Sequence, residues 1–183
     1  MKNNIIDIVS NSFNAKNKWG LVIGDIMLDK YINGDVKRLS PEAPVPIVNV
    51  NDNIHKIGGA GNVALNLLGL GIKTVIVGEI GNDNSGEILK KLFRESGLPT
   101  KHLVKKKGAT TTKTRIMSGQ QQIARLDYDE FSKGPNQIEL KNILKLVSNG
   151  PSAIIISDYE KGFLTTLALK KIIQLANKKN IPI

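Results

Sequence analysis

The segment Gly58-Gly59-Ala60-Gly61-Asn62-Val63-Ala64 runs a glycine cluster straight into a predicted helix. Glycine has no Cβ, so such a turn can adopt left-handed dihedral angles and let a ligand approach the main chain. The helix is expected to end at Gly71. Its expected buried residues are Val63, Leu67, Leu68 and Leu70. Because the first N–H groups of a helix are unpaired and carry positive partial charge, we expect the turn to bind an anion or a sugar.

Short apolar stretches alternate with amphipathic ones along most of the chain. The predicted strands cover residues 19–27, 74–77, 102–104, 111–117, 121–126 and 153–156, and the predicted helices cover residues 85–96, 137–147 and 165–178. The strand at 153–156 is almost wholly apolar, which is typical of a parallel strand covered on both faces. This order predicts a doubly wound, mostly parallel α/β sheet that binds ligands at the carboxyl ends of its strands.

Three further segments define the expected domain organisation. Residues 1–18 are predicted to form a helical extension, because their apolar residues recur at helical spacing. Prolines between residues 40 and 50 exclude a helix interior, and a turn is expected before them at Asn33-Gly34. Residues 19–183 are therefore expected to form the N-terminal part of one domain, with a β flap near 31–50 and 111–127. Residues 180–183 resemble the start of another buried strand, so we expect a domain truncated at Ile183.

The composition narrows the classes of partner. The formal net charge is +10, but the 26 Lys and Arg residues are scattered apart from one cluster at Lys105-Lys106-Lys107. No helix-turn-helix or zinc pattern accompanies them, so we expect no nucleic-acid partner. The absence of cysteine excludes disulfides and thiolate sites, and His55 and His102 offer little for a metal centre. No apolar run approaches the roughly 18 residues that span a bilayer, and no signal peptide is evident, so we expect a cytoplasmic protein with no membrane partner.

Acidic residues follow two of the predicted strands. The apolar run 21–23 of the first strand ends in Gly24-Asp25 and is followed by Asp29, and Asp158 follows the strand at 153–156. Because the carboxyl ends of parallel strands meet at one edge of a sheet, these acids are expected to converge. Carboxylates accept strong hydrogen bonds from sugar hydroxyls. The alternative is that these are solvated acids in ordinary strand-end turns.

Basic residues supply a candidate phosphate site. Lys113 and Arg115 alternate with threonines on one predicted strand, so both side chains should share a face, and Arg125 follows on the next strand. Three cations on adjoining strands could clamp a phosphate, with arginine giving a bidentate contact. The alternative is the polar face of an antiparallel pair at a sheet edge.

The glycine turn also fits a second class of protein. Gly59-x-Gly61-x-x-Ala64 matches the relaxed dinucleotide-binding fingerprint, and Glu79 lies 18 positions after Gly61, where a ribose-binding acid belongs. An NAD(P)-dependent oxidoreductase is therefore the alternative function. Against it, such a turn should follow a buried strand, and residues 54–57 are too short and too polar to be one.

Five segments, in chain order, resemble the ribokinase-like (PfkB) sugar kinases. They are GDIMLDKY at 24–31, SPEAPVP at 40–46, GGAGNVA at 58–64, QQIARLD at 121–127 and SDYEKG at 157–162. The resemblance covers about 19–183, and SPEAPVP and SDYEKG are much more specific than the glycine turn. Within the family, the sequence is most similar to the heptose 7-phosphate kinases of ADP-heptose synthesis.

The resemblance implies a kinase that transfers the γ-phosphoryl group of ATP, with Mg²⁺, to the C1 hydroxyl of D-glycero-D-manno-heptose 7-phosphate for the lipopolysaccharide core. In such kinases the residues matching Asp29, Gly58, Gly59 and Asn62 hold sugar hydroxyls. The remaining substrate-binding candidates are Asp25, Lys113, Arg115, Arg125, Asp158 and Lys161. The Pro-rich flap would cover the sugar and pair subunits into a homodimer.

The resemblance also implies where the catalytic base belongs. The Gly-Ala-Gly-Asp motif that carries this base lies in the C-terminal half of such kinases, and it is absent from these 183 residues. We therefore assign no catalytic residue to the chain and expect the base beyond Ile183. The chain alone is expected to be inactive as a kinase.

Overall fold

The computed structural model describes residues 18–183, which form two sheets and four helices. The helical extension predicted over 1–18 lies outside the described residues, apart from Lys18. The first sheet has the order β5-β4-β1-β8, and all its strands are parallel. These strands are β1 (Gly20–Gly24), β4 (Thr74–Gly81), β5 (Leu103–Lys106) and β8 (Ala153–Ser157). The predicted parallel sheet is therefore confirmed.

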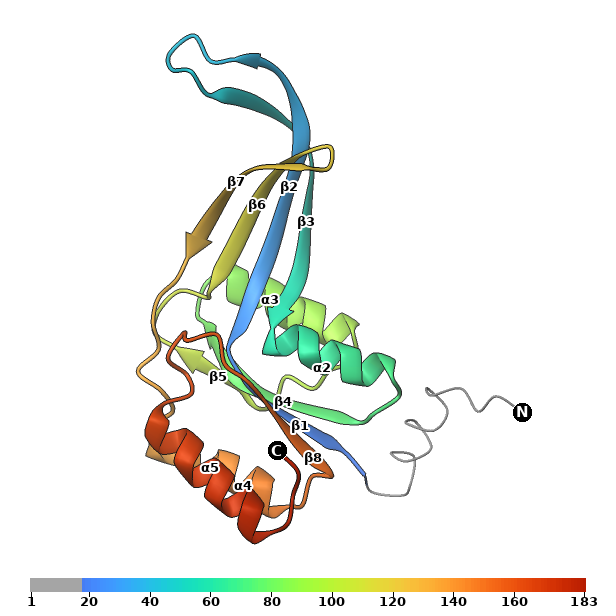
Figure 1. Ribbon diagram of the computed structural model, residues 1–183, viewed down its shortest axis with the longest axis vertical. Coiled ribbons are helices and arrows are strands. Elements are labelled where there is room, and N and C mark those ends of the chain that lie inside the picture. The colour runs from blue at the N-terminus through green and yellow to red at the C-terminus, as the bar shows by residue number, and fades with distance from the viewer. Residues whose placement is uncertain (1–17) are drawn as a thin grey trace, which may run out of the picture.

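Helices cover both faces of this sheet (Figure 1). They are α2 (Ala60–Gly69) and α3 (Asn84–Glu95) on one face, and α4 (Gln137–Ser148) and α5 (Thr166–Lys178) on the other. Alternate residues of β1 point into the two cores, since Leu21 packs with Ile143 and Ile172, whereas Val22 packs with Leu89 and Phe93. This two-sided burial explains the continuous apolar run in β1 and confirms the doubly wound arrangement.

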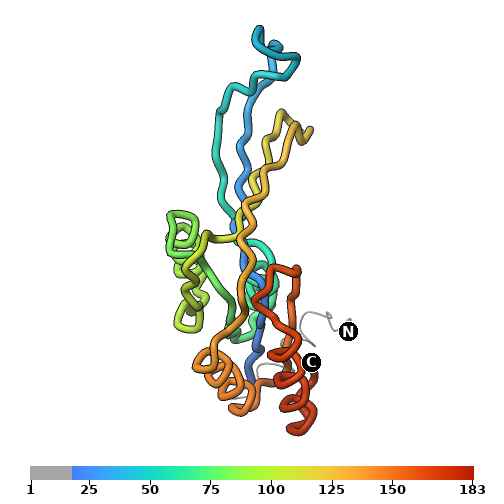
Figure 2. The backbone as a smooth tube through the Cα atoms, turned by 90° about the vertical axis from the view of Figure 1, so that its left-hand side faces the viewer, coloured from blue at the N-terminus to red at the C-terminus, as the bar shows by residue number. Residues whose placement is uncertain are grey.

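The second sheet projects from this body as a long, narrow ribbon (Figures 1 and 2). It has the order β3-β2-β6-β7. Its strands are β2 (Ile26–Leu39), β3 (Pro46–Gly59), β6 (Thr112–Ser118) and β7 (Gln121–Tyr128). β2 pairs antiparallel with β3 and parallel with β6, and β6 pairs antiparallel with β7. Since β2 follows β1 after the single residue Asp25, the base of the ribbon lies at the carboxyl edge of the parallel sheet.

One sequence prediction about the ribbon was wrong. Asn33-Gly34 is no turn, because β2 continues through it with a register shift at that step. A Cβ on Gly34 would overlap the carbonyl oxygen of Asn49, so glycine permits the close approach of the two strands there. Residues 54–57 belong to β3, a mostly exposed antiparallel strand, so the prediction that they are no buried strand is confirmed.

The predicted buried side of α2 was only partly right. Its fully buried residues are Ala60, Gly61 and Ala64, whose small side chains let the helix lie close to the sheet. Val63, Leu67 and Leu68 are partly buried against the core, and Leu70 is 39% exposed because it is the C-cap. Gly71 follows with φ of 78°, as expected for a residue that ends a helix.

The last residues lie beside β8 but form no further strand. Residues 181–183 have no regular secondary structure. Ile181 is buried in the core with Val147, and Ile154 N–H donates to the carbonyl oxygen of Pro182 at 2.8 Å. Ile183 is 48% exposed. The chain therefore begins to pair with β8 at Pro182, and the expected further strand stays a prediction.

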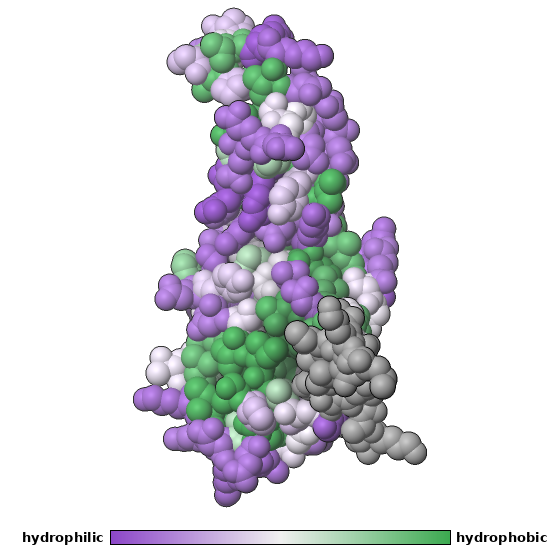
Figure 3. All heavy atoms as spheres, turned by 45° about the vertical axis from the view of Figure 1, so that its right-hand side comes forward, coloured by the Kyte–Doolittle hydropathy of each residue, from purple (hydrophilic) through white to green (hydrophobic). Residues whose placement is uncertain are grey.

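The surface differs between the two parts of the molecule. On the face seen in Figure 3, the ribbon is mostly hydrophilic and the body carries a broad hydrophobic area. Among the described residues, no helix is long and apolar enough to cross a membrane.

Candidate functional site

The glycine turn connects β3 to α2 beside the junction of β1 and β2. Gly59 is the N-cap of α2 and has φ of 58° and ψ of −136°, a conformation that only glycine adopts readily. Ala60 N–H donates to the carbonyl oxygen of Asp25 at 2.8 Å, so one of the first helix amides is already occupied. A Cβ on Gly59 would overlap that same carbonyl. The glycine is therefore required both by its dihedral angles and by the close contact with the β1–β2 junction.

Asp29 lies on β2 directly against this turn. A Cβ on Gly58 would overlap Oδ2 of Asp29, so the missing side chain leaves room for the carboxylate. Arg115 Nη1 donates to Oδ1 of Asp29 at 2.6 Å from the neighbouring strand β6. This hydrogen bond raises the pKa of the Arg115 guanidinium. The carboxylate is thus fixed from one side, and its Oδ2 faces the main chain of the glycine turn.

The strand registers place a group of charged side chains on the same face of the ribbon. Paired residues point to the same face, and Asp29 pairs with Lys56 on β3 and Lys113 on β6. Two residues further along the ribbon, Tyr31 on β2 pairs with Arg115 on β6, and Arg115 pairs in turn with Arg125 on β7. We call this surface the cationic face; its residues are Asp29, Tyr31, Lys56, Lys113, Arg115, Arg125 and Asp127. Its four cations outnumber its two carboxylates.

Internal contacts hold the side chains of the cationic face. The charged groups of Lys56 and Arg115 lie 5.1 Å and 5.2 Å from the ring centre of Tyr31. Arg125 Nε lies 2.9 Å from Asp127 Oδ1, and the Arg125 side chain is half exposed. Tyr31 and Lys56 are not among the site residues predicted from the sequence. The two-residue spacing from Asp29 could have identified Tyr31, whereas Lys56 depends on the β2–β3 register.

The loop after β8 approaches the cationic face. The Tyr159 ring centre lies 5.9 Å from Lys113 Nζ. Asp158 is exposed, and its Oδ1 accepts a hydrogen bond from Glu160 N–H at 2.8 Å, within a turn in which Glu160 has φ of 57°. Lys161 Nζ lies 2.6 Å from Asp129 Oδ2. The loop therefore borders the face, with Asp158 bonded within its own turn and Lys161 paired to the segment that follows β7.

Asp25 connects that loop to the centre of the sheet. Its residue is 3% exposed, and its Oδ2 accepts hydrogen bonds from Tyr159 N–H at 2.8 Å and Lys161 N–H at 3.2 Å. The carboxylate is thus satisfied by backbone groups more than 130 residues away in sequence. Its contacts are those of a residue that positions the loop.

Asn62 lies in the first turn of α2 and is exposed. It lines a shallow hollow with Lys56, Leu92 and Ser96. In the described part of the chain, no hydrogen bond joins its side chain to Asp29. Asn62 therefore makes no hydrogen bond to the Asp29 carboxylate, although α2 follows the glycine turn that contacts it.

Ile183, beyond which the sequence analysis expects the catalytic base, adds no reactive group to this site. Its side chain is aliphatic and cannot accept a proton from a hydroxyl, and it lines neither the hollow beside Asn62 nor the small pocket beside Asp25 and Lys161. Among residues 18–183 we assign no catalytic base, and its location beyond Ile183 stays a prediction.

The topology contradicts the dinucleotide interpretation. That interpretation requires the glycine turn to follow a central parallel strand, but the turn follows β3, an antiparallel edge strand of the ribbon. The central strand β1 ends instead at Gly24 and Asp25. Glu79 lies on β4 in a separate cavity, described below. Within residues 18–183, no group of three His, Cys, Asp or Glu side chains could hold a metal ion.

Comparison with known proteins gives one family match and several similar proteins of the same name. The family described as pfkB family carbohydrate kinase matches residues 21–180. The chain is 42% identical to the Bifunctional protein HldE of Methylobacillus flagellatus, over all of this chain and 38% of that protein. It is 41% identical to the Bifunctional protein HldE of Magnetococcus marinus, over 91% of this chain and 35% of that protein. The chain thus spans little more than a third of the length of these curated relatives.

Solved structures share the fold at low sequence identity. A carbohydrate kinase from Agrobacterium tumefaciens aligns with a TM-score of 0.65 at 20% identity, over 90% of this chain and 52% of that chain. The tetrameric inhibited form of phosphofructokinase-2 from Escherichia coli aligns with a TM-score of 0.64 at 18% identity, over 90% of this chain and 51% of that chain. With the family match over nearly all the described residues, the chain belongs to the pfkB family of carbohydrate kinases.

Proposed function

We propose that this chain is the sugar-binding part of a kinase that phosphorylates the C1 hydroxyl of D-glycero-D-manno-heptose 7-phosphate. The product would serve ADP-heptose synthesis for the lipopolysaccharide core. The observation that carries the proposal is the Asp29 carboxylate, held by Arg115 against Gly58 at the base of the cationic face. The similarity to proteins named Bifunctional protein HldE supports the choice of heptose.

In this proposal, Asp29 and the glycine turn bind the sugar ring. Oδ1 of Asp29 is taken by Arg115, which leaves Oδ2 to accept a hydrogen bond from a hydroxyl. Gly58 and Gly59 allow the ring to approach the main chain. Asn62 and Asp158 are the further hydroxyl ligands, and Asn62 reaches the sugar from the first turn of α2. Asp25 contributes by holding the loop that carries Asp158 and Lys161.

The cationic face binds the 7-phosphate in this proposal. Lys113, Arg115 and Arg125 lie on two adjacent strands and point to one side of the ribbon. Arg125 is half exposed and paired only with Asp127, its neighbour on the same strand, so a phosphate can replace that carboxylate. A sugar without the phosphate would lose these contacts, so the face favours phosphorylated sugars.

The far end of the ribbon is the proposed dimer contact and lid. Leu39, Val45 and Val50 near its tip are 63%, 52% and 60% exposed, which is unusual for branched apolar side chains of a lone hairpin. Pairing of two ribbons would bury them. Closure of the ribbon over the sugar would also exclude water, which protects a phosphoryl donor from hydrolysis.

ATP and Mg²⁺ are the proposed donor and metal of the whole enzyme. ATP supplies the phosphoryl group, and the residues of this chain bind and orient the acceptor. The described residues hold no carboxylate cluster for a metal, and no Gly-Ala-Gly-Asp motif occurs in the sequence. We therefore propose that the base is supplied from beyond Ile183, and that the isolated chain binds the sugar phosphate and does not transfer phosphate to it.

A thermal-shift comparison of five ligands tests the proposal. Heptose 7-phosphate at about a hundred times its Kd is expected to add about 2.7 kcal/mol to the free energy of unfolding, which raises Tm by several degrees. D-fructose, D-ribose and NAD at the same concentration are expected to leave Tm within about one degree, since they lack either the phosphate or the hydroxyl pattern. Heptose without the phosphate should give a clearly smaller rise. An increase caused by NAD, or equal increases for phosphorylated and unphosphorylated heptose, would contradict the proposal.

A further inference from the structure

A cavity of about 520 Å³ lies apart from the cationic face, at the carboxyl ends of β4 and β5. It is bounded by β5 and the residues after it, by the segment from Glu130 to Asn136 and by the start of α4. None of its lining residues belongs to the ribbon strands β2, β3, β6 or β7. Its charged lining residues are Glu79, Lys105, Lys106, Lys107, Glu130, Lys133 and Glu139. The lysine cluster and Glu79, which the proposed function does not use, therefore meet in one place.

Two of the three acids in this cavity are occupied by backbone amides. Glu130 Oε2 accepts a hydrogen bond from Ala109 N–H at 2.7 Å, and its carboxylate lies against Gly108. Glu139 Oε2 accepts a hydrogen bond from Asn136 N–H at 2.7 Å within the capping box of α4. Both carboxylates are therefore held in place by backbone N–H groups, and these contacts have a structural role.

The lysines are mostly without anionic partners. Lys106 Nζ donates to the carbonyl oxygen of Glu130 at 2.6 Å, which leaves its charge unneutralised. Lys105, Lys107 and Lys133 line the same space, and no ion pair within 4.0 Å joins any of them to an acid of the described chain. Four cations thus border one concave space at the sheet edge where α/β proteins bind ligands.

Glu79 adds a partly buried carboxyl group, one oxygen of which is unpaired within residues 18–183. Its Oε2 is buried and has no hydrogen-bond partner among the described residues. Burial raises the pKa of this carboxyl group, whereas a hydrogen bond with Ser132 and the charge of Lys106 act in the opposite direction.

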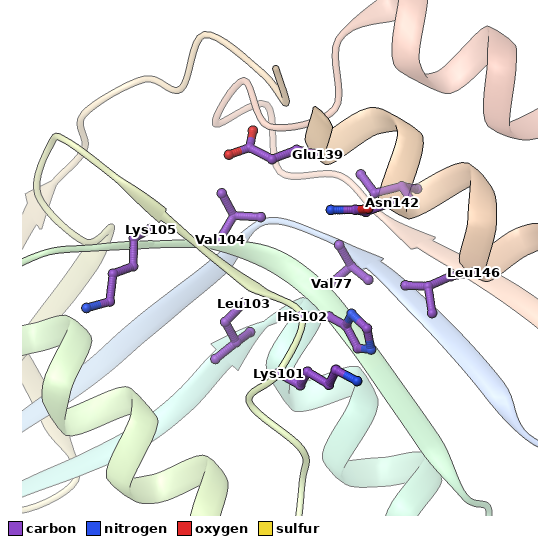
Figure 4. A pocket seen from close by; sticks show the side chains of 10 residues that line it. Val77, Lys101, His102, Leu103, Val104, Lys105, Glu139, Asn142 and Leu146 are labelled. Atoms are coloured by element: carbon purple, nitrogen blue, oxygen red, sulfur yellow. The ribbon is translucent and has the colours of Figure 1, made fainter. Parts of the chain in front are cut away.

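An adjoining hollow of about 270 Å³ extends the cavity along β5 (Figure 4). The two spaces share Val104, Lys105 and Glu139. Val77 and Leu146 give the hollow an apolar floor, and the side chains of His102 and Asn142 face its interior (Figure 4). The hollow offers space for a neutral part of a ligand whose charged end meets the lysines.

We propose that this cavity is a second anion site, which binds a small phosphorylated molecule through Lys105, Lys106, Lys107 and Lys133. The phosphate lies among the lysines and the neutral remainder lies in the hollow beside Leu146. The site shares no residue with the cationic face, although its Glu79, Lys106 and Ser132 also line the small pocket beside Asp25 and Lys161. A ligand bound in the cavity would contact both the end of β5 and the segment before α4.

An NMR titration of the ¹⁵N-labelled chain with inorganic pyrophosphate tests this site. Saturable amide shifts are expected at residues 104–108 and 132–134, beyond those caused by sodium chloride at equal ionic strength. The variant K105Q/K107Q/K133Q is expected to raise the Kd at least about tenfold, equivalent to about 1.4 kcal/mol. The matched control is K170Q/K171Q/K178Q on α5, which removes the same charge and should change the Kd less than about twofold, because distant charges are screened.

The outcomes separate the second anion site from the cationic face. Shifts confined to residues 112–127 would mean that pyrophosphate binds only to the ribbon and would overturn the inference. Shifts that do not saturate, or equal weakening by both triple variants, would show general charge attraction in place of a site. Since none of the replaced lysines is buried, both variants are expected to fold, and superposable spectra outside the replaced positions will verify this.

Discussion

Replacement of Asp25 by alanine is expected to lower the free energy of unfolding by about 3 kcal/mol, the largest stability effect of any substitution considered for this chain. The carboxylate is buried and accepts two backbone hydrogen bonds, from Tyr159 and Lys161. Hydrogen bonds to charged groups are worth about 1.5–3 kcal/mol each, and the amides would be left without an acceptor. Urea denaturation followed by circular dichroism will measure the change.

A matched control separates this effect from loss of charge alone. Asp158→Ala removes an exposed carboxylate from the same loop, where it accepts only the local bond from Glu160, and should cost less than about 1 kcal/mol. Asp25→Asn keeps an acceptor oxygen and should fall between the two alanine variants. If Asp25→Ala and Asp158→Ala proved equally stable, Asp25 would not be the residue that holds the loop.

Replacement of Gly58 by alanine is expected to weaken heptose 7-phosphate binding about a hundredfold, or about 2.7 kcal/mol. The new Cβ would overlap Oδ2 of Asp29 and lie 2.8 Å from Cγ of Met27. The Asp29 carboxylate ends its side chain and can move, whereas Met27 is 3% exposed, so some loss of stability is expected as well. The movement would displace the Asp29 carboxylate from Arg115 and from the sugar. Isothermal titration calorimetry and urea denaturation measure the two quantities separately.

Gly69 provides the control for this substitution. It lies at the end of α2, and a Cβ there meets no atom within 4 Å. Gly69→Ala should bind the sugar phosphate as tightly as the unaltered chain and should be slightly more stable, because alanine favours helix. Unchanged binding by Gly58→Ala would mean that Asp29 does not need its position against the turn, and the proposed site would then be wrong.

The elements of the parallel sheet could be predicted because each carries its own local signal. The apolar runs of β1 and β8 reflect burial on two faces, and Gly97 and Gly150 follow helix ends with positive φ. The ribbon was harder to predict, since its strands are exposed and carry no such run. The passage of β2 through Asn33-Gly34 depends on its pairing with β3, which the local sequence of β2 does not indicate.

The candidate site could be predicted in part, since only some of its residues belong to a local sequence pattern. The alternation of Lys113 and Arg115 placed both on one face, because strand periodicity is local. The Asp29–Arg115 pair joins residues 86 positions apart, and no local pattern indicates it. Asp25 was expected to bind the substrate, since a strand-end acid looks the same in sequence whether it meets a ligand or a distant backbone amide. The Lys161–Asp129 pair is likewise a product of tertiary packing.

The most direct measurement of the central claim is an NMR titration with heptose 7-phosphate that locates the bound sugar on the chain. If Asp29 and the glycine turn hold the sugar and the cationic face holds its phosphate, the largest shifts will fall at Asp29, Gly58, Gly59, Lys113 and Arg115. They will disappear in Asp29→Ala while the remaining spectrum stays folded. Saturable shifts that avoid these residues, or that persist in Asp29→Ala, would show that the sugar phosphate binds elsewhere and would contradict the proposed function.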